Sequence, residues 1–64
     1  MLLLRIERHL RARRVPLTRF GRDAIGDPWL VRDMREGRVL RDRTVARITA
    51  YLDRVEGVAN EEPP

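Results

Sequence analysis

Arginine is the residue type in this sequence with the most potential for binding chemistry. All 14 basic residues of the 64-residue chain are arginines, and seven of them lie between Arg5 and Arg22 beside one acidic residue, Glu7. Residues 1–55 hold all 14 arginines and seven acidic residues, a net charge of +7 within a whole-chain charge of +4. Codon bias in a GC-rich genome explains the lack of lysine, so the clustering matters more than the residue type. Because guanidinium groups bind phosphate through paired hydrogen bonds and stack on bases, the clustering favours a polyanion-binding surface.

Residues for catalysis do not occur in the combinations that catalysis needs. His9 is the only histidine, and there is no cysteine to act as a nucleophile or to join His9 at a zinc site. The sequence has no glycine-rich phosphate loop after a strand and no carboxylate pair expected on one helix face. We therefore expect no enzyme activity, no metal site and no cofactor, and interpret His9 as a partly buried or surface residue.

Length and composition predict one small domain. A hydrophobic fraction of 42% is enough for one core in 64 residues without disulfides. The longest apolar run, Met1 to Leu4, is far too short for a membrane span or a signal peptide. A small protein without disulfides fits the cytoplasm, and a DNA-bound one would be nucleoid-associated. We expect a helical domain over residues 1–57 and a disordered acidic tail over 58–64.

The spacing of apolar residues predicts an all-α fold, a compact bundle of four to five helices without strands. The expected helices cover about 2–13, 17–25, 28–36 and the stretch from Asp42 to 56. Pro16 should end the first helix, because a proline moves the preceding residue out of the helical region. Asp42 is the expected N-cap of the last helix, and Gly57 its end. Between the last two helices, Val39 and Leu40 are expected to tuck beneath the connection. The apolar faces of the first and last helices are Leu2, Leu3, Ile6 and Leu10, and Val45, Ile48, Leu52 and Val55.

Residues 18–37 have the sequence form of a helix-turn-helix. Gly26 can adopt the positive φ that ends one helix, and Gly37 can end the next in the same way. Asp27 can accept backbone N–H bonds as an N-cap, and Pro28 needs no N–H at the first helical position. The inward residues of the two helices are Phe20, Ala24 and Ile25, and Leu30, Val31 and Met34.

Two residues of this segment bear on how the helices pack. Gly21, in mid-helix, costs about 1 kcal/mol relative to alanine and suits a place where another helix crosses closely. Trp29, the only tryptophan, has two interpretations. It either packs helix 28–36 against the first or last helix, or it lies exposed, over DNA or at a protein interface.

From Phe20 to Leu52 the chain resembles the Cro and phage-repressor class of helix-turn-helix domains, also called xenobiotic-response-element-like regulators. That family has a small residue after an apolar one, a capping residue at the turn, two apolar positions three apart and then a glycine. The residues at these places are Phe20, Gly21, Asp27, Val31, Met34 and Gly37. Downstream, Asp42, Val45, Ile48 and Leu52 match the next capping and apolar positions. The family's turn glycine aligns with Ile25, and Gly26 lies one place later.

The resemblance implies a sequence-specific regulator of transcription, a phage-like repressor or activator that binds double-stranded DNA with helix 28–36 in the major groove. The base-contacting residues would be Trp29, Arg32 and Asp33, with Arg32 the best candidate for a guanine edge. Taken together with the charge distribution, the resemblance implies that the residues contacting DNA phosphates are Arg19, Arg22, Arg35, Arg38 and Arg41. A module of this size has little contact area, so specific binding calls for a homodimer or a protein partner.

Two alternatives remain at this point. The same fold could serve as a protein-interaction module that docks on RNA polymerase, a toxin or a second regulator through Trp29, the first helix or the arginines. The first helix could also lie on a membrane surface. That last interpretation fails if the core needs the face formed by Leu2, Ile6 and Leu10.

Overall fold

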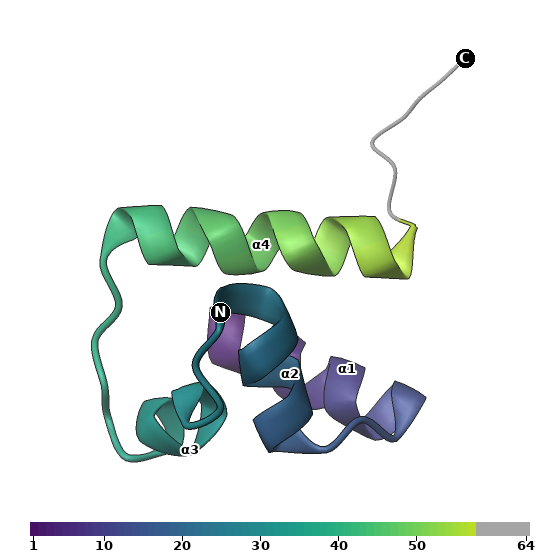
Figure 1. Ribbon diagram of the computed structural model, residues 1–64, viewed down its shortest axis with the longest axis horizontal. Coiled ribbons are helices and arrows are strands. Elements are labelled where there is room, and N and C mark those ends of the chain that lie inside the picture. Colours follow the sequence, from purple (N-terminus) through teal and green to yellow (C-terminus); the bar gives the residue numbers. More distant parts are fainter. Residues whose placement is uncertain (58–64) are drawn as a thin grey trace.

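The computed structural model describes residues 1–57, which form four α-helices and no strand (Figure 1). The helices are α1 (Leu2–Arg13), α2 (Leu17–Ile25), α3 (Leu30–Arg35) and α4 (Asp42–Glu56). The predicted all-α fold is therefore confirmed, with four helices in this part of the chain. The tail predicted to be disordered, residues 58–64, lies outside the described residues.

The helices pack around one core. In Figure 1, α4 runs along one side of the molecule, α1 and α2 lie beneath it, and α3 lies at the end where its connection returns to α4. Helix α2 packs on both α3 and α4, and α1 contacts the same two helices. All four helices therefore contribute to a single packed unit, with α1 and α2 each contacting both α3 and α4.

Phe20 of α2 lies where the helices meet. Its side chain is fully buried, and its ring centroid lies 5.6 Å from that of His9 on α1 and 5.6 Å from that of Tyr51 on α4. The Tyr51 ring meets it edge-on, which is a favourable arrangement for aromatic pairs. The remaining buried apolar side chains are Ile6, Leu10, Leu30, Val31, Ile48 and Leu52. One aromatic residue of α2 thus links three helices, and buried aliphatic side chains from α1, α3 and α4 fill the space around it.

The apolar face of α1 belongs to this core. Ile6 is fully buried, Leu10 is almost so, and Leu2 and Leu3 pack against them. This arrangement excludes the membrane-surface interpretation of α1, because that face is already covered by protein. In residues 1–57, moreover, no helix combines the length and apolar character needed to cross a bilayer.

Left-handed residues end the helices, as the sequence predicts at the glycines. Gly26 has φ 72° after α2, and Gly37 has φ 101° after α3. After α2, the Asp27 N–H donates to the carbonyl of Gly21, six residues back (3.1 Å), and after α3 the Arg38 N–H donates to the carbonyl of Asp33, five residues back (2.9 Å). The bond after α3 is that of the Schellman pattern, and both bonds satisfy helix carbonyls where the chain reverses.

Helix α1 ends in the same way without a glycine. Arg14 takes the left-handed conformation with φ 54°, and the N–H of Val15 donates to the carbonyl of Leu10 (3.1 Å). Pro16 then lies at the N-cap position of α2, where its carbonyl accepts the N–H of Phe20 (3.1 Å). The predicted end of α1 is correct, and Pro16 starts the next helix.

Three local predictions are wrong. Regular helix α3 begins at Leu30 instead of Pro28, because the Asp27 carbonyl accepts the Leu30 N–H (3.2 Å) in a tight turn before the helix. Asp42 is the first residue inside α4, with Arg41 at the N-cap position and no side-chain capping bond. Val39 is 91% exposed, and only Leu40 packs against the core.

The crossing of α2 and α3 is as close at Gly21 as the sequence predicts. A Cβ atom built on Gly21 would fall well inside van der Waals contact of the Asp27 carbonyl oxygen and 3.1 Å from Cβ of Leu30. Backbone atoms cannot move aside as a flexible side chain can. The turn between the helices therefore requires a residue without a side chain at this position.

We predict that Gly21→Ala destabilises the fold despite the better helix propensity of alanine. The expected loss is about 1 to 3 kcal/mol in the free energy of unfolding, because overpacking at the crossing outweighs the propensity gain. Chemical denaturation followed by circular dichroism measures it. Arg22→Ala, at the next and exposed position of α2, is the control and should change stability little. A Gly21→Ala variant as stable as wild type would contradict the crossing described here.

Candidate nucleic-acid interface

The start of α3 is held by the side chain of Asp27. Its Oδ1 accepts the backbone N–H of Trp29 (3.0 Å), and its Oδ2 accepts a hydrogen bond from Nη1 of Arg38 (2.7 Å). The same Arg38 nitrogen lies 3.4 Å from Oδ2 of Asp33. The bonds from Arg38 and then from the Trp29 N–H lower the pKa of Asp27. The turn before α3 and the loop after it are thus connected through one carboxylate.

Trp29 and Arg32 lie together on the outer side of this helix. Trp29 is 52% exposed, which decides between its two interpretations: it is a surface residue and not part of the core. The guanidinium carbon of Arg32 lies 4.9 Å from the centroid of the indole ring, a cation–π distance. Of the three predicted base-contacting residues, these two are in contact. Asp33, the third, is half-buried and interacts with Arg38 instead.

Arg35, predicted to contact phosphate, forms a bidentate ion pair with Glu7. Its Nε and Nη2 donate to the two carboxylate oxygens of Glu7, both at 2.7 Å. These hydrogen bonds lower the pKa of Glu7 and raise that of Arg35. The pair connects α3 to α1. A DNA phosphate would have to replace the Glu7 carboxylate to bind Arg35, and the Asp27 carboxylate to bind Arg38.

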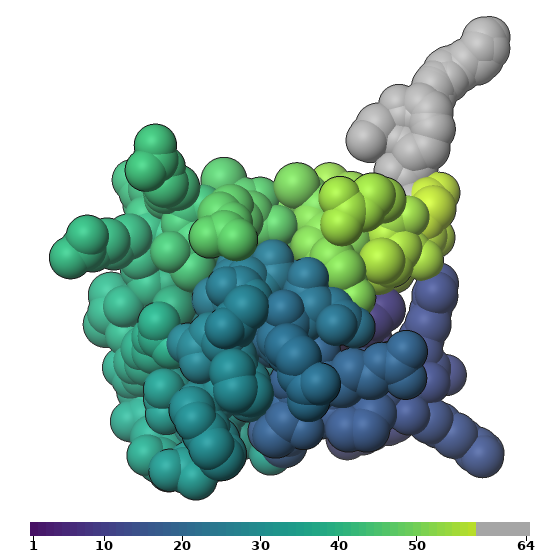
Figure 2. All heavy atoms as spheres, in the orientation of Figure 1, coloured from purple at the N-terminus to yellow at the C-terminus, as the bar shows by residue number. Residues whose placement is uncertain are grey.

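The other arginines predicted to contact phosphate form weaker ion pairs or none within residues 1–57. Arg19 is exposed and lies 3.6 Å from Asp23 one turn along α2. Arg22 and Arg41 are exposed and have no acidic partner among residues 1–57. Figure 2 shows long side chains standing out at the beginning of α4 and around the end of α1. Further exposed arginines of α1, of its C-terminal end and of α4 that have no ion pair within residues 1–57 are Arg8, Arg11, Arg14, Arg43 and Arg47.

Nothing in the local sequence pattern identifies Glu7 and Asp27 as the partners of these arginines. Glu7 is 28 residues from Arg35, and Asp27 is 11 residues from Arg38. Such pairs depend on how the helices pack, which periodicity does not specify. Asp27 was predicted as a capping residue. It does accept a backbone N–H, but its bond to Arg38 had no signal in the sequence.

A comparison with known proteins gives no family for this chain. It matches no protein-family model, no curated protein and no solved structure.

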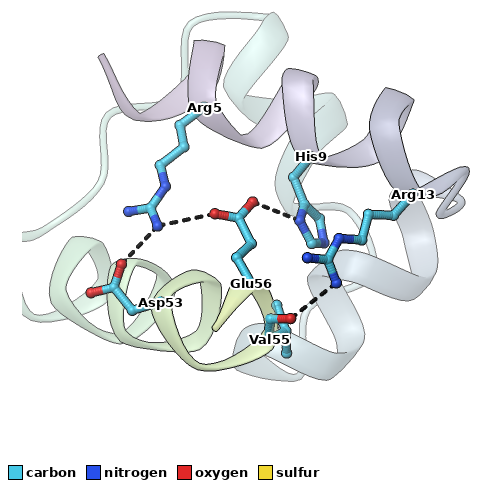
Figure 3. Close-up of polar contacts among 6 residues, drawn as sticks. All are labelled: Arg5, His9, Arg13, Asp53, Val55 and Glu56. Carbon is cyan, nitrogen blue, oxygen red and sulfur yellow. Dashed lines mark hydrogen bonds and ion pairs between the residues drawn. The ribbon is translucent and has the colours of Figure 1, made fainter. Parts of the chain in front are cut away.

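His9 belongs to a polar cluster between α1 and the end of α4 (Figure 3). Its ring is buried, and its Nδ1 donates to Oε2 of Glu56 (2.9 Å). Nη2 of Arg5 donates to Oδ1 of Asp53 (2.7 Å) and to Oε1 of Glu56 (3.2 Å), and Arg13 donates to the carbonyl of Val55. Every polar partner in this cluster comes from within the fold. The cluster therefore acts as a clasp that holds α1 to α4.

No metal site accompanies this clasp in residues 1–57. That part of the chain contains no group of three histidine, cysteine, aspartate or glutamate side chains suited to a metal ion. His9 was expected to be partly buried or at the surface, and the structure places it inside.

We predict that the clasp makes stability depend on acidic pH. Partial burial would raise the pKa of Glu56, but the hydrogen bonds from His9 and Arg5 outweigh it and leave this pKa below its ordinary value of 4.5. A carboxylate with a lowered pKa stabilises the fold above the unfolded-state value, and this contribution is lost as the pH falls through the lowered value. Glu56→Gln should therefore cost about 1 to 2 kcal/mol at neutral pH.

The measurement is the free energy of unfolding of wild type and Glu56→Gln between neutral pH and pH 3. The difference between them should shrink as the pH falls below 4.5. Glu36→Gln, at an exposed position without an ion pair in residues 1–57, is the matched control. A difference that stays constant over this range would show that the Glu56 charge does not stabilise the fold.

Proposed function

We propose that this protein is a sequence-specific double-stranded DNA-binding regulator of transcription that acts at the nucleoid in the cytoplasm, with α3 in the major groove. The observation that carries the proposal is the exposed Trp29–Arg32 pair at the start of a short helix, which a close glycine crossing sets against α2. Support also comes from the resemblance of residues 20–52 to Cro and phage-repressor domains and from the excess of arginine.

The chemistry of α3 suits base reading better than general attraction to DNA. Segment 27–38 contains three arginines and three acidic residues, so its net charge is zero. Its exposed residues nevertheless include two that can recognise base edges, Trp29 and Arg32, since a guanidinium matches guanine O6 and N7 and an apolar ring can contact the methyl of thymine.

The attraction to phosphate would come mainly from outside α3. Arg19 and Arg22 on α2 and Arg41 before α4 are exposed, whereas Arg35 and Arg38 already bind carboxylates. If Arg35 or Arg38 binds a phosphate, its ion pair with a carboxylate is lost. Each therefore contributes less binding free energy than an arginine that has no ion pair in the free protein. We therefore infer that Arg22 and Arg41 contribute most to the salt dependence of binding.

The length of α3 limits how much DNA one copy can read. Its six residues span about 9 Å, less than one helical turn of DNA. A single copy would contact only a few base pairs. We infer that it binds as a homodimer on paired half-sites or together with a second protein.

A second candidate function is docking on a protein such as RNA polymerase or another regulator. The observation that favours it is an exposed apolar area at the start of the chain, where Met1 and Leu4 border an open hollow of about 430 Å³. Its other lining residues are Leu2, Arg5, Arg8 and Thr49. Salt separates the two functions, because phosphate contacts weaken steeply with salt and apolar contacts do not.

Salt-dependent binding to duplex DNA tests the proposal. Fluorescence anisotropy with a mixed genomic duplex library should give a dissociation constant that rises steeply with salt. In the double variant Arg22→Gln/Arg41→Gln, the slope of log K against log salt should fall by about two, close to 0.9 for each phosphate contact removed. The loss should be similar for every sequence, because phosphate contacts carry no base information.

Arg54→Gln is the control. Arg54 is exposed at the far end of α4 and lies over the Tyr51 ring, so its removal takes away the same charge without a predicted phosphate contact. It should leave the slope almost unchanged. If wild type binds no duplex even at low salt, DNA binding is wrong and the protein-docking candidate takes its place.

A further inference from the structure

Trp29 is not one of the core residues, so packing in the core does not explain why a tryptophan is present at this position. The side chains that pack in and around the core do not include it, and half of its surface faces solvent. Its partner in space is Arg32, three residues later on the same side of α3, with the guanidinium 4.9 Å from the ring centroid. The indole is therefore in contact with an arginine that is itself exposed to solvent.

The backbone at Trp29 is held by hydrogen bonds. The N–H of Trp29 donates to Asp27, and Asp27 is held in turn by Arg38 from the far end of α3. Trp29 is also the last residue before the regular helix, and its carbonyl accepts the N–H of Asp33 (2.9 Å). Hydrogen bonds thus fix the backbone from which the indole projects, and in this arrangement the ring lies under the guanidinium of Arg32.

Stacking changes what Arg32 can do. A free arginine side chain samples many rotamers and loses that freedom when it binds. A guanidinium that lies over a ring keeps its edge N–H groups available, since the cation–π contact uses its face. Holding the group in one place before binding reduces the entropic cost of a two-pronged hydrogen bond.

We propose that Trp29 is a positioning residue for Arg32, and that together they read a guanine next to a thymine in the major groove. Arg32 donates two hydrogen bonds to O6 and N7 of the guanine, and the exposed part of the indole contacts the 5-methyl group of the neighbouring thymine. This inference rests on the proposed DNA binding and names the base step that the same site recognises.

The test begins with selection of preferred duplexes from a random library by the wild-type protein. The selected site should contain guanine beside thymine at the position that Arg32→Lys no longer distinguishes. In that duplex, guanine is replaced by 7-deazaguanine, which lacks the N7 acceptor, or thymine by uracil, which lacks the methyl group. Wild type should lose roughly tenfold in affinity with the first and a few-fold with the second.

The decisive variant is Trp29→Leu. It should lose most of the discrimination between guanine and 7-deazaguanine, although Arg32 is still present, and should keep the salt dependence of wild type. Trp29→Phe retains an aromatic ring and should retain most of the discrimination. Val39→Ala truncates another exposed apolar residue outside α3 and is the control. Circular dichroism on each variant checks that the fold is intact.

The outcomes separate this inference from the proposed function. If wild type binds no duplex, DNA binding itself is wrong. If wild type binds with steep salt dependence but Trp29→Leu keeps the full penalty for 7-deazaguanine, or weakens all sequences equally, Trp29 does not position Arg32. Should Trp29→Leu fail to fold, the uracil duplex decides with wild type alone, because an unchanged affinity would rule out the contact between Trp29 and the thymine methyl.

Discussion

The close approach of Asp27 to Gly21 is the constraint on which the rest of the structure depends. The Asp27 carbonyl occupies the space that a side chain on Gly21 would need, and the Asp27 N–H donates to the Gly21 carbonyl. The carboxylate of the same residue holds the Trp29 N–H and Arg38. One residue therefore sets the distance between α2 and α3, the place where α3 begins and the path of the chain after it.

The arginines divide into those that hold the fold and those that face solvent. Arg5 and Arg35 connect α1 to α4 and to α3, with partners 28 to 51 residues away along the chain. Ion pairs at the surface contribute little singly, but the Arg5 pairs belong to the clasp between α1 and α4, and the Arg35 pair joins α1 to α3. The overall charge is consequently a poor measure of the charge available to a partner. What remains available lies mainly on α2, at the end of α1 and at the start of α4.

Periodicity and glycines predicted most of the fold. The bounds of α1 follow from apolar residues three and four apart, and Gly26 and Gly37 have the positive φ angles that end α2 and α3. Prediction failed where the outcome depends on packing between distant segments. The local pattern was compatible with Trp29 in the core or at the surface. It also predicted that Val39 packs beneath the connection between α3 and α4, whereas Val39 is exposed to solvent. The partners of the candidate site residues were not predictable, because the bond from Arg38 to Asp27 exists only once the turn has formed.

The positive and negative charges around α3 cancel, and this limits how strongly the helix attracts a polyanion. With equal numbers of arginine and acidic residues in segment 27–38, a polyanion gains little from approaching this helix by charge alone. Under the proposed function, misplaced phosphates would meet Asp33 and Glu36 as well as Arg32, so a poor fit would be penalised. An unbalanced helix would bind any sequence tightly, and base preference would then contribute a small share of the free energy. Under the proposed function, the acidic residues on α3 serve specificity by lowering the affinity for every site that Arg32 does not match.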